Sequence, residues 1–372
     1  MKKNKIWLSS PHMGESEQKY IQEAFNSNWI APIGCHIELF EKSLESFLHK
    51  GYVSALNSGT AALHLALKSA GIEKGDTVLC QTHTHIASVN PVVYQNATPV
   101  FIDSEPDTWN MSPELLEKAI LDLNTKGIKP KALVIVHLYG MPAKMSEILE
   151  IARKYNLKVI EDAAESLGSR INEQMTGTFG DYGILSFNGN KIITTSGGGA
   201  LITKTEKDKQ KAIFWATQAR DKAPHYQHSE IGYNYRMSNI VAGIGRGQME
   251  VLPLRIKQRR ANFDFYKENL KNLPLELAPV EPAGYFSNRW LTTVLTDSYK
   301  TREKIRLALE QENIEARPLW KPMHLQPVFK NAPAYVNGVS EDLFNRGLCL
   351  PSGSNLTSKD KERVVKAIKK VF

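Results

Sequence analysis

The sequence predicts an α/β protein in which a mostly parallel, seven-stranded sheet is followed by a smaller C-terminal α+β domain. Short, continuous apolar runs alternate with amphipathic stretches over about two thirds of the chain, the pattern of parallel strands buried on both faces and separated by helices. After about Asn239 this alternation gives way to one long helical stretch. The length of 372 residues suits two domains of roughly 100–200 residues each.

Seven apolar runs predict the strands of the first domain, in chain order Val53–Leu56, Thr77–Cys80, Pro99–Asp103, Ala132–Val136, Lys158–Asp162, Gly183–Phe187 and Ala200–Thr203. Amphipathic stretches between them predict helices, such as those at Ala61–Ala70, Ser112–Thr125 and Met145–Tyr155. Strand and helix in alternation indicate a parallel sheet with helices on both of its faces.

The rest of the chain predicts the smaller domain. A helix is expected from about Ile240 to Leu270, and Pro253 should kink or interrupt it because proline lacks a backbone N–H. One or two strands and two helices complete the domain, near Trp290–Leu295, Ile314–Pro318, Lys300–Glu312 and Lys359–Val371. We therefore predict a large domain with an N-terminal arm at residues 1–245 and a small domain at residues 246–372.

Composition indicates an ordinary soluble globular protein, with 42% hydrophobic and 23% charged residues. No apolar run approaches the roughly 18 residues of a membrane span, and the basic start lacks the apolar core of a secretory signal. The three cysteines have neither metal-ligand spacing nor a disulfide pattern, so no metal site is predicted. We expect a cytoplasmic protein.

The net charge is +8, from 47 Lys and Arg against 39 Asp and Glu. The densest basic cluster comprises Arg255, Lys257, Arg259 and Arg260. We interpret this cluster as a solvated helix face, and the alternative is a patch that attracts a nucleotide diphosphate, a nucleic acid or a membrane surface. No nucleic-acid reader motif accompanies the charge, so no nucleic-acid partner is predicted.

Ligands of open α/β sheets bind beyond the carboxyl ends of the strands, so the residues just after each predicted strand are the candidates for a site. After the first strand, Asn57–His64 is a turn of small residues that opens into a helix, which suits a phosphate. The alternative there is an ordinary N-cap at Ser58. After the second strand, His83 and His85 lack a third metal ligand, so His85 either stacks on a flat ring or is structural.

The later strands are succeeded by an acid and a lysine. Asp162 ends the fifth strand, where it either pairs with a protonated ring nitrogen or caps a helix. Lys191 lies among small and polar residues after the sixth strand, where a desolvated lysine can form a Schiff base, although most lysines lie at the surface. The glycines Gly197–Gly199 precede a strand, so they do not fit a dinucleotide fingerprint.

These features together are those that pyridoxal 5'-phosphate needs: a lysine for its aldehyde, an acid for its ring nitrogen, a phosphate cup and a flat group over the ring. The set, in this order, resembles the fold-type I pyridoxal-phosphate enzymes, and more closely the DegT/DnrJ/EryC1/StrS family of nucleotide-sugar aminotransferases. The motifs that carry the resemblance are Ser58–Leu63, Glu161–Ala164, Ser186–Gly199 and Gly232–Ser238. Two further stretches, Ser27–Pro32 and Arg317–His324, resemble the branch that aminates UDP-linked 4-keto-6-deoxy sugars, with bacillosamine-pathway transaminases as the nearest match.

The resemblance implies a role for each matching residue. Lys191 is implied as the Schiff-base lysine and proton shuttle, and Asp162 as the partner of the pyridine nitrogen. The implied phosphate contacts are Gly59, Thr60, Ala61 and Ser186. His85 takes the stacking place where the family often has Trp or Phe, and Glu165 takes a place near the ring hydroxyl often filled by Gln or His. Asn234 is implied to reach the phosphate of the neighbouring subunit in a homodimer with shared active sites.

The implied reaction moves an amino group from glutamate to C4 of a UDP-linked 4-keto-6-deoxy-N-acetylhexosamine for glycan or polysaccharide synthesis. The expected substrate contacts are Asn28, Trp29, Ile30, Ala31, Arg317, Trp320, Lys321 and His324. Family members that dehydrate carry His in place of the lysine, so Lys191 favours amino transfer. Five alternatives stay open: C3 rather than C4 amination, a dTDP- or GDP-linked sugar, a non-catalytic sensor of the cofactor or the nucleotide sugar, a nicotinamide-dependent sugar oxidoreductase, and a structural scaffold protein.

Overall fold

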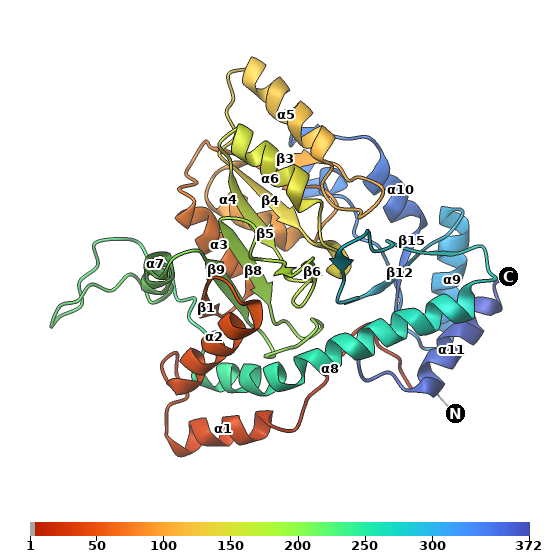
Figure 1. Cartoon of the computed structure of the whole chain (residues 1–372), viewed down its shortest axis with the longest axis horizontal. Helices are drawn as coiled ribbons and strands as arrows, with labels where there is room; N and C mark the ends of the chain where they lie inside the picture. Colours follow the sequence, from red (N-terminus) through yellow and green to blue (C-terminus); the bar gives the residue numbers. More distant parts are fainter. Residues whose placement is uncertain (1–3) are drawn as a thin grey trace.

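An eight-stranded sheet forms the centre of the structure, a computed structural model that describes residues 4–372 (Figure 1). Its strands run in the order β1 Tyr52–Leu56, β9 Gly199–Thr203, β8 Tyr182–Ser186, β5 Lys158–Asp162, β4 Ala132–Val136, β2 Thr77–Gln81, β3 Thr98–Ile102 and β14 Ala334–Tyr335. All neighbouring pairs are parallel except the two that involve β9. The mostly parallel sheet and its seven predicted strands are therefore confirmed.

The eighth strand, β14, departs from the seven-stranded prediction. It comes from the C-terminal third of the chain and pairs in parallel with β3, with Ala334 opposite Phe101 and Tyr335 opposite Ile102. A two-residue strand is too short to show a hydrophobic period, so no pattern along the chain indicates it.

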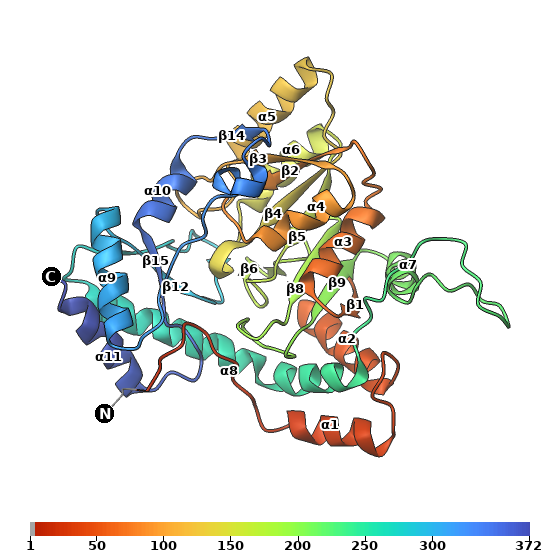
Figure 2. The ribbon, with the colours of Figure 1, turned by 180° about the vertical axis from the view of Figure 1, so that it is seen from behind.

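Successive residues of each strand point to opposite faces of the sheet and enter different hydrophobic cores. In β2, Val78 and Cys80 face one core, whereas Leu79 faces another. Figures 1 and 2, seen from opposite sides, show helices over both faces. One face is covered by α3 Gly59–Ser69, α4 Asn90–Tyr94 and α7 Glu206–Ala216, and the other by α2 Cys35–Leu48, α5 Pro113–Thr125, α6 Met145–Lys154 and part of α8 Asn239–Leu270.

Capping side chains explain where several helices begin. The Ser58 hydroxyl accepts a 3.0 Å hydrogen bond from the Ala61 N–H at the start of α3, and Ser112 does the same for Leu115 in α5. Each cap satisfies one of the N–H groups that the first turn of a helix leaves unpaired. The predicted N-cap at Ser58 is thus present.

The C-terminal part of the chain forms a second body around the sheet β10-β12-β15-β13. Its elements are β10 Glu276–Leu277, β12 Thr292–Leu295, β13 Arg317–Pro318, β15 Gly347–Leu350, α9 Tyr299–Gln311, α10 Val339–Arg346 and α11 Ser358–Lys369. A small third sheet joins β11 Tyr285–Phe286, β6 Arg170–Ile171 and β7 Gln174–Met175. At the other end of the chain, Ile6 pairs with Ile314 and is buried in the C-terminal core, whereas α1 Glu17–Asn26 packs on α8.

The long helix α8 connects the two bodies (Figure 1). Pro253 does not interrupt it, because buried residues anchor the helix on both sides: Leu252 and Ile256 in a core of the large sheet, Tyr266 and Leu270 in the C-terminal core. The predicted division at residues 245 and 246 falls inside this helix and stays a prediction.

The interpretation of the basic cluster on α8 as a solvated face is wrong for two of its members. Arg255 is 4% exposed and Arg259 is 1% exposed, and both donate hydrogen bonds to backbone carbonyls. Arg260 pairs with Glu281, and only Lys257 is exposed. The acceptors lie far away in the sequence, so a charge pattern read along the helix does not reveal them.

Two further observations complete the description of the fold. Within residues 4–372, the structure contains no helix with the length and apolarity needed to cross a membrane. The segment between α7 and α8 projects from the body at the left of Figure 1, and there Tyr226 and Ile231 are both 78% exposed.

Candidate active site

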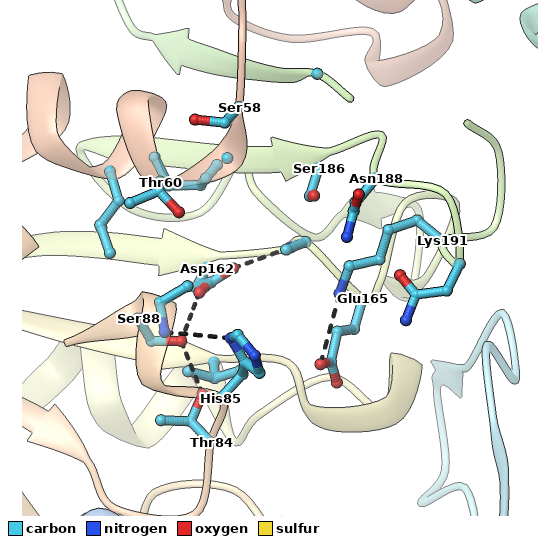
Figure 3. Close-up of a pocket in the computed structure, with 18 of the residues that line it drawn as sticks. Ser58, Thr60, Thr84, His85, Ser88, Asp162, Glu165, Ser186, Asn188 and Lys191 are labelled. Carbon is cyan, nitrogen blue, oxygen red and sulfur yellow. Dashed lines mark hydrogen bonds and ion pairs between the residues drawn. The ribbon is translucent and has the colours of Figure 1, made fainter. Parts of the chain in front are cut away.

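A cavity of about 350 Å³ lies at the carboxyl ends of β1, β2, β5 and β8 (Figure 3). Because these four strands all point the same way, the segments that succeed them meet at one edge of the sheet. The cavity volume is within the range of about 300–1,000 Å³ that small-molecule sites occupy. The C-terminal body closes one side of it with Trp290 and Trp320.

Asp162 ends β5 inside this cavity with both carboxylate oxygens engaged. Its Oδ2 accepts a 2.7 Å hydrogen bond from the Ser88 hydroxyl, which also contacts the Thr84 hydroxyl at 2.7 Å. Its Oδ1 accepts a 3.1 Å hydrogen bond from the Ala164 N–H. The residue is only 7% exposed in this orientation. A buried acid held this way can balance one positive charge on a ligand.

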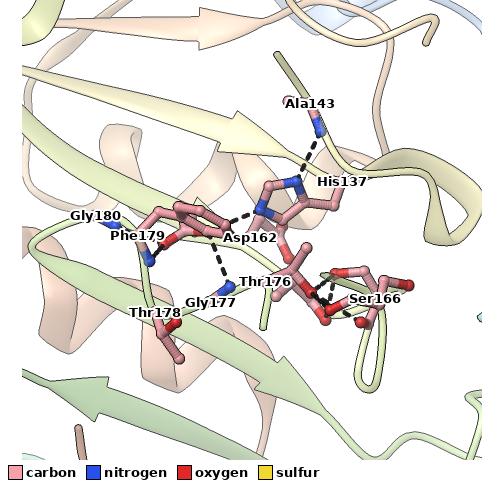
Figure 4. Close-up of polar contacts among 12 residues, drawn as sticks. His137, Ala143, Asp162, Ser166, Thr176, Gly177, Thr178, Phe179 and Gly180 are labelled. Carbon is pink, nitrogen blue, oxygen red and sulfur yellow. Dashed lines mark hydrogen bonds and ion pairs between the residues drawn. The ribbon is translucent and has the colours of Figure 1, made fainter. Parts of the chain in front are cut away.

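The preceding residue, Glu161, anchors the end of the same strand from the opposite side of the sheet. Its fully buried carboxylate accepts hydrogen bonds from the N–H groups of Gly177, Phe179 and Gly180, at 2.8, 2.6 and 2.6 Å. His137 donates a fourth bond from Nε2, because its Nδ1 accepts from the Ala143 N–H (Figure 4). This network fixes the strand end that carries Asp162.

Lys191 lies on the far side of the cavity from β5, in the segment between β8 and β9. Its Nζ is 3.7 Å from Oε1 of Glu165 and 4.2 Å above the ring of Trp290, and its side chain is 13% exposed. The other oxygen of Glu165 accepts a 2.7 Å hydrogen bond from the Tyr139 N–H. Burial raises the pKa of the Glu165 carboxyl, and the charge of Lys191 opposes that rise.

The start of α3 forms a concave cradle against β8 and β9. A Cβ on Gly59 would lie 3.1 Å from Cβ of Ser186, and a Cβ on Gly199 would lie 2.3 Å from the Gly59 nitrogen. Glycine is therefore required at position 199, where a side chain would collide with the backbone of the helix start, and a side chain at position 59 would fit tightly against Ser186. The last of the three glycines at 197–199 serves this packing. The helix start directs its N–H groups and dipole at the cavity, where an anion is stabilised.

His85 lines the cavity between the strand end and the C-terminal body. Its Nδ1 accepts a 3.2 Å hydrogen bond from the Ala87 N–H, and its ring meets Trp320 edge to face at 5.1 Å. Burial lowers the pKa of His85 and the charge of Lys191 lowers it further, so the imidazole is neutral near pH 7. A neutral, flat ring is suited to stacking on another ring.

This donor set fits pyridoxal 5'-phosphate. The glycine cradle at the helix start suits the phosphate, Asp162 suits a protonated ring nitrogen, and Lys191 suits an aldehyde. Each group projects into the same cavity from a different strand end.

The structure brings together eight of the predicted site residues around the cavity: Gly59, Thr60, His85, Asp162, Glu165, Ser186, Lys191 and Trp320. Ala61 lies just behind the cradle, 4% exposed, with its N–H bonded to Ser58. Asn234 is exposed at the rim, where its backbone carbonyl accepts a 3.1 Å hydrogen bond from Asn57.

The other predicted substrate contacts lie outside the cavity of the single chain. Asn28, Trp29, Ile30 and Ala31 form an exposed segment whose backbone is held by Asn239. Arg317 is 68% exposed and pairs with Glu315 in a separate surface cleft, and Lys321 is exposed. Both ring nitrogens of His324 have partners: Nδ1 lies 2.7 Å from the Thr82 hydroxyl, and Nε2 lies 3.1 Å from Oε1 of Glu341. Their substrate roles stay predictions.

The cavity-lining residues that sequence reasoning missed include four polar or aromatic ones: Ser88, Asn188, Asn190 and Trp290. Asn188 and Asn190 precede the lysine by three residues and one residue within a motif already singled out, so their closeness to it was a usable signal. Ser88 and Trp290 reach the site through the tertiary fold, three residues beyond His85 and from the C-terminal body respectively.

The family model of the DegT/DnrJ/EryC1/StrS aminotransferases matches residues 11–369. The chain belongs to this family. It is 52% identical over 372 residues to EpsN of Bacillus subtilis (strain 168), provisionally assigned as a pyridoxal phosphate-dependent aminotransferase, with 99% of this chain and 96% of that protein covered. It is 37% identical over 367 residues to the GDP-perosamine synthase of Escherichia coli O157:H7, with 99% and 98% covered.

A solved DegT/DnrJ/EryC1/StrS aminotransferase from Brucella abortus has the same fold, with a TM-score of 0.89, 29% identity and 95% of each chain covered. Three predictions are thereby confirmed: the fold-type I architecture, the dependence on pyridoxal phosphate, and the activity class of nucleotide-sugar aminotransferase.

Proposed function

We propose that this DegT-family enzyme transfers an amino group from glutamate to C4 of a UDP-linked 4-keto-6-deoxy-N-acetylhexosamine. The observation that carries the amino transfer is the placement of Lys191, Glu165 and Asp162 around one cavity. Trp320, from the stretch that resembles the bacillosamine-type transaminases, lines the same cavity. An indole face beside polar groups suits the amphipathic face of a sugar. The product is a UDP-linked 4-amino-4,6-dideoxy sugar for glycan or polysaccharide synthesis.

Each residue has a task that its position supports. When bound, pyridoxal phosphate supplies an electron sink for the carbon that loses its proton. Lys191 Nζ removes the proton from the amino-bearing carbon of glutamate and, in the second half of the reaction, delivers a proton to C4 of the sugar. Proton transfer by a positioned group contributes on the order of 10²–10⁴ in rate. The Asp162 carboxylate keeps the ring nitrogen protonated.

We further propose a homodimer in which each subunit completes the site of the other. Asn234 supports this, because it is exposed at the rim of the cavity while its backbone is held by Asn57 of the same chain. The projecting segment before it leaves Tyr226 and Ile231 uncovered. Trp29 and Ile30, 55% and 44% exposed, add a further apolar surface. The three cysteines are unpaired, which suits the reducing cytoplasm where we propose that the enzyme acts.

A GDP-linked keto sugar is the second candidate. Its support is the 37% identity to the GDP-perosamine synthase over 99% of this chain. The contacts assigned to the nucleotide, Arg317 among them, lie outside the cavity and do not separate the two candidates.

A substrate panel tests the proposal. The enzyme is incubated with glutamate and, separately, with UDP-, dTDP- and GDP-linked keto sugars, and products are read by mass spectrometry. We expect an amino product from the UDP-linked 4-keto-6-deoxy-N-acetylhexosamine with the highest kcat/KM. A higher kcat/KM for a GDP-linked sugar would establish the second candidate instead, and nuclear magnetic resonance of the product separates C3 from C4 amination.

A further inference from the structure

Arg259 is a fully buried arginine whose hydrogen bonds converge on the segment that carries Lys191. Its Nη1 donates to the carbonyls of Trp290 at 2.7 Å and Ser352 at 3.3 Å. Its Nη2 donates to the Ser9 hydroxyl at 2.9 Å and to the carbonyl of Lys191 itself at 3.4 Å. One guanidinium therefore joins the N-terminal segment, the C-terminal body and the lysine segment.

Two of these partners also hold the residue before the lysine. The Asn190 carbonyl accepts a 2.6 Å hydrogen bond from the Ser9 hydroxyl and a 2.7 Å bond from Nε1 of Trp290. The Trp290 ring lies under Nζ of Lys191 at 4.2 Å. The backbone at Asn190 and Lys191 and the ring beneath the amino group are thus fixed by a single set of contacts centred on Arg259.

The positive charge of Arg259 has no acidic partner. Its acceptors are carbonyl and hydroxyl oxygens, and across residues 4–372 no carboxylate forms an ion pair with it. Burial lowers the pKa of the guanidinium to about 9, which still leaves it charged at pH 7. An uncompensated buried charge is costly, so a residue needed only for packing would be better served by an apolar side chain.

Arg259 belongs to a row of polar side chains on one face of α8. Members of this row bind backbone carbonyls of other segments: Arg255 those of His12 and Met13, Asn262 those of Ser352 and Gly353. Arg259 differs from them because its contacts include the lysine segment. The row provides a matched comparison, since Arg255 is nearly as buried, carries the same charge and lies one turn away.

We propose that Arg259 is a positioning residue that sets the placement of the Lys191 amino group for proton transfer. It acts from the C-terminal half of α8 through the backbone of Lys191 and through Trp290. This inference rests on the proposed role of Lys191. Because reacting groups must be aligned closely, a shift of about 1 Å in such a group can cost about 100-fold in rate.

The test compares Arg259→Gln and Arg259→Lys with Arg255→Gln in the full chain. In the cofactor-free protein, peptide mass spectrometry follows the modification of Lys191 by trinitrobenzenesulfonate. In the loaded enzyme, the visible absorbance of the cofactor is titrated with pH, and the single-turnover rate with glutamate is measured across glutamate concentrations. Thermal midpoints are recorded for all variants.

We expect Arg259→Gln to speed modification of Lys191 severalfold and to shift the midpoint pH of the cofactor absorbance titration. The single-turnover rate at saturating glutamate should fall about 100-fold, with little change in glutamate affinity. Arg259→Lys, which can reach only part of the four acceptors, should give intermediate values. Arg255→Gln should lower the thermal midpoint but match the unchanged protein in the other three measurements.

The proposal is wrong if Arg259→Gln and Arg255→Gln give the same modification rate of Lys191, the same absorbance titration and the same single-turnover rate. Arg259 would then be a core residue only. If Arg259→Gln does not fold, Arg259→Lys decides: values equal to those of the unchanged protein overturn the proposal, and intermediate values support it. Borohydride labelling of the unchanged protein separates this failure from that of the proposed function, which fails if Lys191 is not the labelled residue.

Discussion

The Ser88 hydroxyl donates a 2.7 Å hydrogen bond to Oδ2 of Asp162, and both side chains are buried. Since Oδ1 of the same carboxylate is held by the Ala164 N–H, neither oxygen is free to turn. The acid that faces the ring nitrogen therefore depends for its orientation on a serine from a different strand end. Ser88 belongs to the short 3₁₀ helix Ile86–Ser88 that also begins with the His85 cap.

Removing that hydroxyl should weaken cofactor binding. We expect Ser88→Ala to raise the Kd for pyridoxal phosphate about tenfold, the effect of losing one hydrogen bond to a charged group. Asp162→Asn should lower the rate constant of the glutamate half-reaction by about 100-fold or more, because a neutral amide does not keep the ring nitrogen protonated. Absorbance titration and stopped-flow measurements check both. Ser166→Ala is the control, since this buried serine lies after the same strand but bonds to Thr176; an equal loss there would contradict a specific role for Ser88.

Lys191→Ala should abolish transamination while the protein still binds the cofactor non-covalently. The cradle at Gly59, the acid and the stacking histidine all remain, so binding persists without the covalent bond. We expect the rate to fall by at least about 10²-fold, the lower end for a lost proton-transfer group. Borohydride reduction and peptide mapping of the unchanged protein should label Lys191, and a label on another lysine would refute the assignment.

Hybrid dimers test whether Asn234 serves the partner's site. Lys191→Ala and Asn234→Ala subunits are each expected to be inactive alone, because every site then lacks one of the two residues. After mixing, a hybrid dimer should regain one working site, which activity and native mass spectrometry of the exchanged dimers can quantify. No recovery after confirmed exchange would show that Asn234 does not act across the interface.

Trp320 and Arg317 should differ in their effects on the nucleotide sugar. Trp320 lines the cavity, so Trp320→Leu should raise the KM for the sugar about tenfold, with a smaller effect on the glutamate half-reaction that uses the same cavity. If Arg317 binds the diphosphate, Arg317→Ala raises the same KM and reduces its salt dependence, because exposed ion pairs are screened. An unchanged KM would assign Arg317 to its surface pair with Glu315 alone.

His83 should make the protein less stable in acid. The side chain of His83 is fully buried, and this burial lowers its pKa from 6.5 to about 4 in the folded chain. Between these values the unfolded chain holds a proton that the folded chain does not, so the free energy of unfolding falls as pH drops from 6.5 toward 4. The full effect is on the order of 3 kcal/mol.

His83→Asn removes this titration. Denaturant unfolding across that pH window should therefore show a shallower decline than in the unchanged protein. His225→Asn is the matched control, because that histidine is exposed and its replacement should leave the slope as it was. Parallel declines in all three proteins would mean that other groups set the acid sensitivity.

The sequence predicted those site residues that lie directly after a buried strand. Asp162 and Lys191 could be placed because continuous apolar runs locate strand ends, and strand ends of a parallel sheet share one edge. Trp290 and Ser88 could not, since their approach to the cavity depends on how the C-terminal body packs and on a short 3₁₀ helix. Arg259 was misread as solvated because its acceptors lie in segments up to 250 residues away.

These long separations along the sequence also determine when the site can be completed during synthesis of the chain. The Leu8 carbonyl accepts its hydrogen bond from the Ser352 N–H, and the Ser9 hydroxyl is held between Asn190 and Arg259. A ribosome releases the N-terminal arm first and Ser352 almost last, so the arm emerges long before its partners do. Contacts that span so much sequence also form slowly. All the contacts that hold the lysine segment can therefore be present only after nearly the whole chain has been synthesised, and a chain that stalls before Ser352 lacks some of them.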